Sequence, residues 1–341
     1  MNGYERIKGA LDGNPTDTIP VMLHNFLMAA RELGVTMEEY RNNPKIIAEA
    51  FIKSVEKYYF DGILVDLDTV TLAGAVGVPV NFPVNDAARS THGNLKELID
   101  IRISAPVDVE NYKFIQVWLE AVRLLKEHFK NEIYIRGNCD QAPFSLASMM
   151  RGMENWMTDL YMGEEELLFE VLDYCKEATL QFIRLMAQTG CDMLSNGDSP
   201  AGPDLLPPEL YEKFALPYEK KIVEESHRFG LPYALHICGN TELILERMLE
   251  TGADAFELDY KTDTQKTFDI LQNKTAFIGN IDPSGVLAMG TPGLTKEKTE
   301  ELLRIFSKTN RFILNAGCAI PANTPEENIR IMIKTAREYK R

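Results

Sequence analysis

The sequence predicts an α/β fold, a closed (β/α)8 TIM barrel, on three observations. Eight short apolar runs alternate with amphipathic helical stretches along the 341 residues, the order expected of parallel strands and covering helices. The length is sufficient for such a barrel with additions to it. No glycine-rich G-x-G-x-x-G segment follows the first run. An open doubly wound sheet usually carries one there, so that fold is the second choice.

The eight predicted strands share one composition. Most are short, rich in Ile, Val, Leu and Phe, and bounded by Gly, Asn or Asp, which is typical of parallel strands buried on both faces. They cover residues 19–23, 62–68, 133–139, 192–198, 233–238, 253–259, 276–282 and 311–318.

The intervals between these runs predict helices. Residues 44–59, 164–187 and 209–229 place apolar side chains at helical spacing. Thr241 is expected to cap a further helix that stops before Gly252.

The last helix is expected to begin with Pro325 in its first turn and Thr324 as its cap. We predict one barrel domain over residues 1–341, with an N-terminal extension at 1–16 and an insertion around 69–110.

The composition excludes several classes of partner. Lys and Arg number 36 against 51 Asp and Glu, and a net charge of −15 disfavours nucleic acids and anionic membranes. No apolar run reaches the roughly 18 residues that a membrane span needs, and the N-terminus lacks the pattern of a secretion signal. Five scattered cysteines fit reduced thiols in a cytoplasmic protein.

Polar residues stand at the ends of seven of the eight predicted strands. The active site of a barrel lies at the C-terminal ends of its strands, so this pattern indicates an enzyme and not a bare scaffold. The residues are Asp66 and Asp68, Asn138 and Cys139, Asn196 and Asp198, His236 and Cys238, Glu257 and Asp259, Asn280 and Asp282, and Asn315 and Cys318.

Four of these residues predict a metal site. His236 and Cys238 are two apart in a strand, so their side chains face the same side, and Cys318 ends the eighth strand. Glu257 ends the neighbouring sixth strand. A histidine, two cysteines and a carboxylate can bind zinc tetrahedrally. Two alternatives stay open for Glu257: it can accept a hydrogen bond from a ligand instead of binding the metal, or Asp259 can take its place.

Several other residues have weaker signals. Cys139 is a spare ligand candidate, and Cys175 and Cys191 are expected in the core. His24 and His92 have no partner spacing and stay unassigned.

Six motifs resemble those of the uroporphyrinogen decarboxylase superfamily over nearly the whole chain. They are GILVDLD at 62–68 with Gly77 after it, APFSL at 142–146, GDSPAG at 197–202, FALPY at 214–218, GNIDP at 279–283 and NTPEEN at 323–328. The resemblance implies a uroporphyrinogen decarboxylase-like (β/α)8 barrel, in agreement with the strand count.

The decarboxylase branch of this superfamily matches poorly at its site. Its arginine-bearing segment, which should bind substrate carboxylates, corresponds here to MLHNFLMAAR at 22–31. Met149 stands where the decarboxylase has a substrate-contacting tyrosine, and Cys318 where it has a histidine. Asp68 and Ser199 are retained, but they do not suffice to hold a substrate with eight carboxylates.

The zinc-dependent corrinoid methyltransferases of the methylcobamide:coenzyme M type resemble this chain more closely. Their zinc motif, His-x-Cys followed far downstream by Cys, matches His236, Cys238 and Cys318. Cobalamin-independent methionine synthases have a similar order with a glutamate, which supports Glu257. The resemblance implies methyl transfer between a methylated corrinoid (methylcobalamin or a relative) and a small-molecule thiol such as coenzyme M.

The remaining site residues are assigned on the same basis. Asp68 and Asp198 are the catalytic candidates, and Met149, Ser199 and Asp282 the candidates for substrate binding. The chain has no Asp-x-His-x-x-Gly segment to supply a cobalt ligand, so a separate corrinoid protein is the expected partner.

Three alternatives stay open. The first is a methyltransferase that loads a corrinoid protein from a methyl ether or amine. The second is a uroporphyrinogen decarboxylase-like decarboxylase, and the third a non-catalytic barrel that binds zinc or corrinoid.

Overall fold

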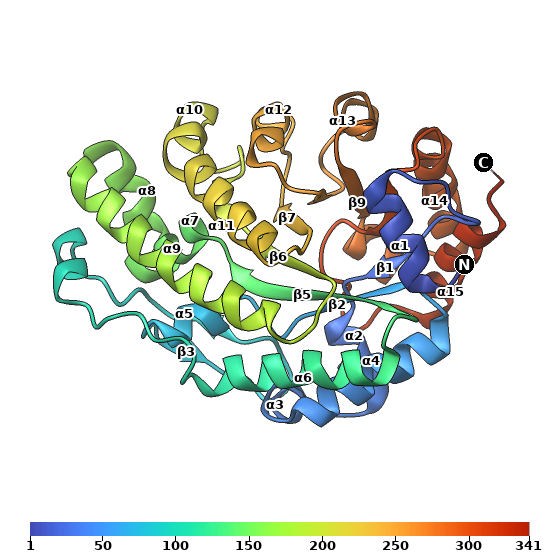
Figure 1. The fold of residues 1–341 in the computed structure, drawn as a ribbon, viewed down its shortest axis with the longest axis horizontal. Coiled ribbons are helices and arrows are strands. Elements are labelled where there is room, and N and C mark those ends of the chain that lie inside the picture. Colours follow the sequence, from blue (N-terminus) through green and yellow to red (C-terminus); the bar gives the residue numbers. More distant parts are fainter. Residues whose placement is uncertain (341) are drawn as a thin grey trace.

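A computed structural model describes residues 1–340 and contains an eight-stranded parallel sheet in the order β1-β2-β5-β6-β7-β8-β9-β10 (Figure 1). A parallel bridge between Val21 and Leu314 joins the first and last strands, so the sheet closes and the barrel prediction is confirmed. The strands are β1 (Met22–Leu23), β2 (Gly62–Val65), β5 (Tyr134–Gln141), β6 (Met193–Gly197), β7 (Tyr233–Ile237), β8 (Ala255–Leu258), β9 (Ala276–Ile281) and β10 (Phe312–Ala316).

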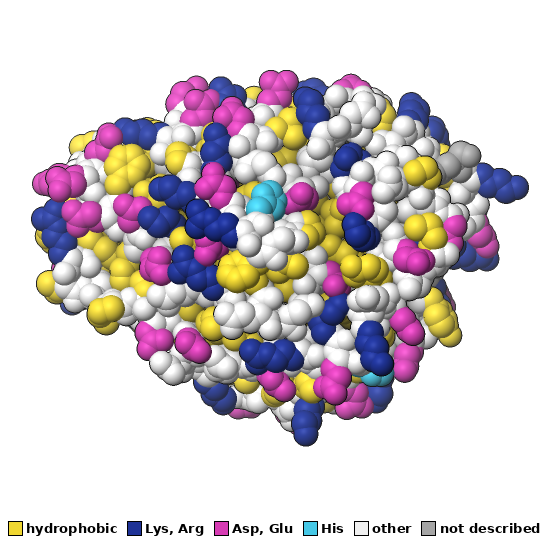
Figure 2. All heavy atoms as spheres, in the orientation of Figure 1, with side chains coloured by type: hydrophobic (Ala, Val, Ile, Leu, Met, Phe, Trp, Pro, Cys, Tyr) yellow, Lys and Arg dark blue, Asp and Glu magenta, His cyan; other side chains and the backbone are white. Residues whose placement is uncertain are grey.

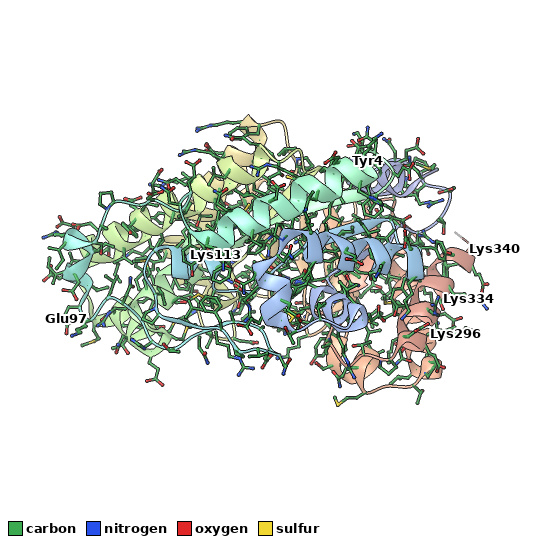
Figure 3. All side chains as sticks on the ribbon, turned by 90° about the horizontal axis from the view of Figure 1, so that it is seen from below. Tyr4, Glu97, Lys113, Lys296, Lys334 and Lys340 are labelled. Atoms are coloured by element: carbon green, nitrogen blue, oxygen red, sulfur yellow. The ribbon has the colours of Figure 1, made fainter. Side chains whose placement is uncertain are left out.

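Helices cover the outside of the barrel, because the strands bury apolar side chains on both faces (Figure 1). Figure 3 shows α6, which begins at Lys113, running beside α4. The longer helices are α1 (Gly3–Asp12), α2 (Phe26–Leu33), α4 (Pro44–Tyr58), α6 (Lys113–Phe129), α7 (Pro143–Arg151), α8 (Met153–Met162), α9 (Glu165–Ala187), α11 (Leu216–Arg228), α13 (Thr264–Leu271), α14 (Pro292–Phe306) and α15 (Glu326–Glu338). The shorter ones are α3 (Met37–Asn42), α5 (Thr71–Ala75), α10 (Pro208–Leu210) and α12 (Leu245–Met248). Short 3₁₀-helical segments lie at Leu98–Ile103, Ser199–Ala201 and Leu249–Thr251, and short π-helical segments at Tyr211–Ala215 and Pro283–Ala288.

The N-terminal helix α1 packs against the barrel interior. Asn2 caps α1 in a capping box with Glu5. Ile7 and Leu11 belong to a second hydrophobic cluster, which collects residues near the starts of the strands. The strand residues of that cluster are Met22, Tyr134, Met193, Ala234, Ala255, Ala276, Ile278 and Ile313. The N-terminal extension therefore covers the end of the barrel opposite the carboxyl ends of the strands.

Two helix-cap predictions were wrong. The Thr241 hydroxyl pairs with the Thr262 hydroxyl at 3.0 Å, and α12 begins only at Leu245, because this tertiary contact takes the hydroxyl that a cap would use. Pro325 is extended at the cap position, so α15 begins one residue later than expected. The stop at Gly252 is confirmed by its left-handed backbone, with φ of 77°.

The surface carries both signs of charge. Figure 2 shows acidic and basic side chains interspersed over one face. Among residues 1–340, no helix has the length and apolar character to cross a bilayer.

Candidate metal centre

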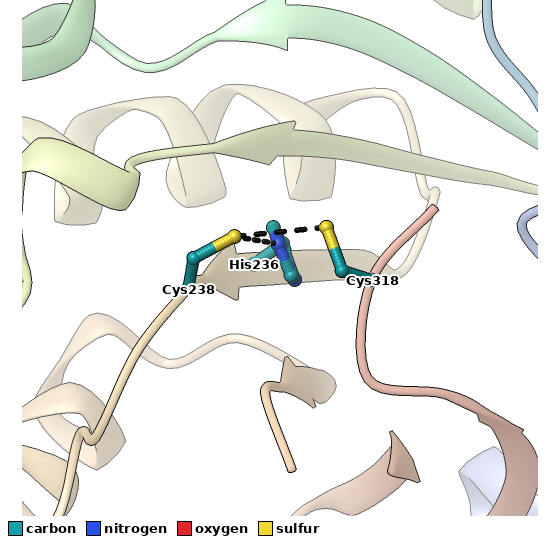
Figure 4. A group of neighbouring side chains, drawn as sticks. All are labelled: His236, Cys238 and Cys318. Atoms are coloured by element: carbon teal, nitrogen blue, oxygen red, sulfur yellow. Dashed lines mark hydrogen bonds between the residues drawn. The ribbon is translucent and has the colours of Figure 1, made fainter. Parts of the chain in front are cut away.

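His236, Cys238 and Cys318 converge at the carboxyl ends of β7 and β10 (Figure 4). His236 Nε2 lies 3.0 Å from Cys238 Sγ, and the two sulfurs lie 3.7 Å apart. The three ligand atoms all lie within 4.8 Å of one another, and within the described part of the chain no other group of at least three His, Cys, Asp or Glu residues meets this condition. Zn–S bonds near 2.3 Å in a tetrahedron separate two sulfurs by about 3.8 Å, so the donor set fits zinc.

The two cysteines of this cluster differ from the other three in exposure. Cys238 and Cys318 are half-buried, whereas Cys139, Cys175 and Cys191 are buried, the last two as expected for core residues. All five are free thiols. Cys139, the spare candidate, does not belong to the ligand group. Only the pair at the carboxyl ends of β7 and β10 is therefore open to an incoming ion or thiol.

The electrostatics of the cluster favour a Cys238 thiolate beside a protonated His236 and a protonated Cys318. The hydrogen bond from Cys318, followed by the charge of His236, lowers the pKa of Cys238 despite its burial. The same hydrogen bond and burial raise the pKa of Cys318 well above its ordinary value. Burial lowers the pKa of His236, but the Cys238 thiolate outweighs this and raises it to about 9. Metal binding would displace the remaining protons, because metal ligands must be deprotonated.

A backbone carbonyl group fixes the orientation of the His236 ring. Its Nδ1 lies 3.0 Å from the backbone carbonyl oxygen of Glu257, to which it can donate. When the ring loses its Nε2 proton, that hydrogen bond keeps the other proton on Nδ1 and leaves the Nε2 lone pair facing Cys238. Nε2 is therefore the ring nitrogen available to a metal ion.

The Glu257 side chain is not part of the ligand group of His236, Cys238 and Cys318. Its carboxylate is ion-paired with Arg136, and both side chains are buried. Its Oε1 lies 3.6 Å from His24 Nδ1 and 3.7 Å from His236 Nδ1. Asp259 also lies outside the ligand group, and its two carboxylate oxygens accept hydrogen bonds from the backbone of Lys261 and Gly239.

Sequence reasoning missed His24 and Arg136. His24 directly follows β1, and its Nε2 lies 2.7 Å from Asp66 Oδ2. Burial lowers the pKa of His24, but Asp66 and Glu257 together raise it above its ordinary value. A signal existed for each residue. His24 completes the set of polar strand ends, and Arg136 is a charge inside an apolar run, two residues before Asn138.

The two catalytic candidates, Asp68 and Asp198, are buried and hydrogen-bonded to neighbouring residues. Asp198 is 0% exposed, and its Oδ1 accepts hydrogen bonds from the backbone and hydroxyl groups of Ser145 at 2.8 and 2.6 Å. Asp68 is also buried, and its Oδ1 accepts from Val70 N and from the Thr71 hydroxyl. Neither residue belongs to the ligand group.

Of the three substrate-binding candidates, the structure brings only Ser199 to the cluster. Its hydroxyl accepts a hydrogen bond from Cys238 N at 3.4 Å. Met149 lines a separate cavity of about 650 Å³ between the end of α7, the start of α8 and the insertion. Asp282 caps the turn that follows β9, accepting from Ser284 N and Gly285 N.

The buried acids Asp198 and Glu219 predict a pH-dependent stability. Burial raises the pKa of Asp198 to about 6 and that of Glu219 well above its ordinary value. The folded state therefore keeps protons that the unfolded chain releases above about pH 4, so stability falls as the pH rises from about 4 through 6. We expect Glu219→Gln to be at least about 1 kcal/mol more stable relative to wild type at pH 8 than at pH 5.

Urea denaturation at both pH values measures this difference. Glu224→Gln, an exposed position on the same helix, is the matched control and should behave as wild type. Equal pH profiles for wild type and Glu219→Gln would contradict the prediction.

The fold and the cluster together define a TIM-barrel protein with a candidate zinc centre at the carboxyl ends of its strands. The chain belongs to the uroporphyrinogen decarboxylase (URO-D) family, whose sequence model matches residues 2–339. The resemblance inferred from the sequence motifs is thereby confirmed.

Two kinds of relative occur in this family. The methylcobamide:CoM methyltransferase MtbA of Methanosarcina acetivorans is 35% identical over 222 residues, which are 65% of this chain and 63% of that protein. The methylcobamide:CoM methyltransferase MtaA of Methanosarcina barkeri is 24% identical over 339 residues, 98% of this chain and 97% of that protein. A uroporphyrinogen decarboxylase of Trichodesmium erythraeum is 30% identical over 320 residues, 90% of this chain and 86% of that protein.

Solved structures support the fold. A methyltransferase from Methanosarcina mazei superposes with a TM-score of 0.89 at 23% identity, covering 99% of both chains. A putative vitamin-B12 independent methionine synthase from Listeria monocytogenes gives a TM-score of 0.54 at 13% identity, covering 94% of this chain and 95% of that one.

Proposed function

We propose that this protein is a zinc-dependent methyltransferase that moves a methyl group between a methylated corrinoid on a partner protein and a small thiol such as coenzyme M. The observation that supports this most strongly is the convergence of His236, Cys238 and Cys318 at the carboxyl ends of the barrel strands. The names of the Methanosarcina relatives point to the same reaction class.

The residues of the cluster have distinct tasks in this proposal. His236 Nε2 and the two cysteine sulfurs would hold the metal, and the Glu257 carbonyl orients the imidazole. Zinc bound there would keep the substrate thiol deprotonated at neutral pH, when a free thiol with a pKa near 8.5 is mostly protonated. Two cysteinates neutralise Zn²⁺, since 2 − 2 = 0, so the sulfur bound beside them keeps its nucleophilic electrons.

The corrinoid is proposed to arrive on a separate protein. No segment of the sequence has the Asp-x-His-x-x-Gly pattern of a cobalt ligand. The half-buried Cys238 and Cys318 face the carboxyl end of the barrel, where a partner can present a methyl group. Ser199, beside Cys238, is the substrate-contacting residue that we retain. Five free thiols favour a reducing, cytoplasmic location.

Decarboxylation of a porphyrinogen is less well supported, although decarboxylases occur among the relatives. In the 22–31 segment the one arginine is Arg31, and its guanidinium donates to the Ala322 carbonyl at 3.1 Å. One arginine cannot pair with many substrate carboxylates.

Metal analysis and a methyl-transfer assay test the proposal together. We expect about one zinc per purified chain and thiol-dependent demethylation of free methylcobalamin. Coenzyme M and homocysteine should be compared as acceptors, and methyl ethers and amines as donors to a cobalt(I) corrinoid, which decides the direction. A protein without zinc, or one that neither loads nor unloads methyl groups, would overturn the proposed function.

A further inference from the structure

Arg136 and Glu257 form a buried ion pair next to His236 of the ligand group. We propose that Arg136 holds the Glu257 carboxylate out of the metal's coordination shell, so that the cluster keeps its fourth position open for the substrate thiol. This inference rests on the proposed function and assigns Arg136 a positioning role in it.

The first argument is the stability of the pair. Arg136 extends from β5 and Glu257 from β8, and their side chains are only 2% and 1% exposed. If Glu257 swung towards the cysteines, the guanidinium would stay buried without its counter-charge, which is strongly unfavourable. The carboxylate is therefore retained by Arg136.

The second argument is the side of the His236 ring on which the Glu257 carboxylate lies. Glu257 Oε2 contacts Arg136, and Oε1 faces the Nδ1 atoms of His24 and His236 at 3.6 and 3.7 Å. The sulfurs lie on the Nε2 side of the His236 ring, because Nε2 is 3.0 Å from Cys238 Sγ. The carboxylate therefore lies on the Nδ1 side of the imidazole, whereas the metal position lies on the Nε2 side.

A carboxylate held away from the metal leaves a coordination position free for the substrate thiol. Three protein ligands with two thiolates give a neutral centre, and an arriving thiolate brings it to 2 − 3 = −1. A carboxylate in the fourth position would give −1 beforehand, so each thiol would have to displace it. Arg136 therefore sets the affinity for thiol by removing a competitor.

Two variants of the cobalt(II)-loaded protein test this inference. Arg136→Gln removes the charge that retains Glu257, and Arg136→Gln/Glu257→Gln then removes the released carboxylate. The readouts are the visible absorption spectrum of bound cobalt(II), its affinity by chelator competition, and the affinity for 2-mercaptoethanol by titration. We expect Arg136→Gln to change the thiol-free spectrum and to weaken 2-mercaptoethanol binding by about tenfold.

The double variant should recover the wild-type spectrum, with cobalt(II) and thiol affinities within about threefold of wild type. A double variant that loses cobalt(II) affinity by about 100-fold while Arg136→Gln leaves the spectrum unchanged would show Glu257 to be a ligand and would overturn the inference. Arg136→Lys, which keeps the charge, should retain the wild-type spectrum and serves if Arg136→Gln does not fold. Wild-type protein that binds no cobalt(II) would refute the metal site itself, which separates failure of the proposed function from failure of this inference.

Discussion

Replacing Cys318 with alanine is expected to remove zinc from the purified protein and to lower thiol methylation by more than about 100-fold. Loss of a hydrogen-bonding partner behind a metal ligand typically costs 10- to 100-fold in affinity or activity, and loss of the ligand itself should cost more. Cys318 supplies one of only three ligand atoms in the cluster, and His236 and Cys238 alone cannot complete a structural or catalytic zinc site. Elemental mass spectrometry and the methylcobalamin assay measure the two effects, and Cys238→Ser should behave in the same way.

Cys139→Ala is the matched control for this prediction. Cys139 also lies near the carboxyl end of a strand but is 0% exposed and outside the ligand group. The variant should keep its zinc and its activity. Full activity of Cys318→Ala would refute the zinc role, and zinc loss in Cys139→Ala would show that the ligand set is different.

Arg136→Met is expected to destabilise the fold by about 3–5 kcal/mol, the cost of breaking a buried ion pair by removing one partner. The substitution leaves the Glu257 carboxylate buried at 1% exposure, beside the imidazoles of His24 and His236 but without its closest positive partner. The barrel interior cannot solvate that charge, so the carboxyl must take up a proton or draw in water. Urea denaturation monitored by circular dichroism measures the loss.

The double variant Arg136→Met/Glu257→Met should regain most of the lost stability. Two apolar side chains of similar length replace two charges, a change that is often neutral or stabilising in a protein interior. A double variant no more stable than Arg136→Met would show that the two residues do not act as a pair. Metal content should be measured in parallel, since the Glu257 carbonyl that orients His236 is retained in every variant.

Much of the fold could be predicted because its signals are local. Each predicted strand contains an observed one or overlaps it at most of its positions, since short apolar runs bounded by polar residues are sufficient to mark buried parallel strands. The cap at Thr241 could not be predicted, because Thr262, from the following loop, binds its hydroxyl. Hydrogen bonds between segments distant in sequence leave no periodic signal.

For the candidate site, the sequence by itself predicted which histidine and cysteines come together and at which end of the barrel they lie. His236 and Cys238 share a strand, so the two-residue period orients both without any knowledge of the rest of the fold. The polar strand ends likewise follow from the alternation of strands and helices.

Only the tertiary structure decided what surrounds those ligands. It placed Glu257 with Arg136, Asp198 with Ser145, and His24 with Asp66. Each of these pairs joins two different segments across the barrel wall or interior. A buried carboxylate goes to the nearest group that can neutralise it or donate hydrogen bonds to it. Which group is nearest depends on strand order and stagger, which are properties of the closed barrel and not of any single segment.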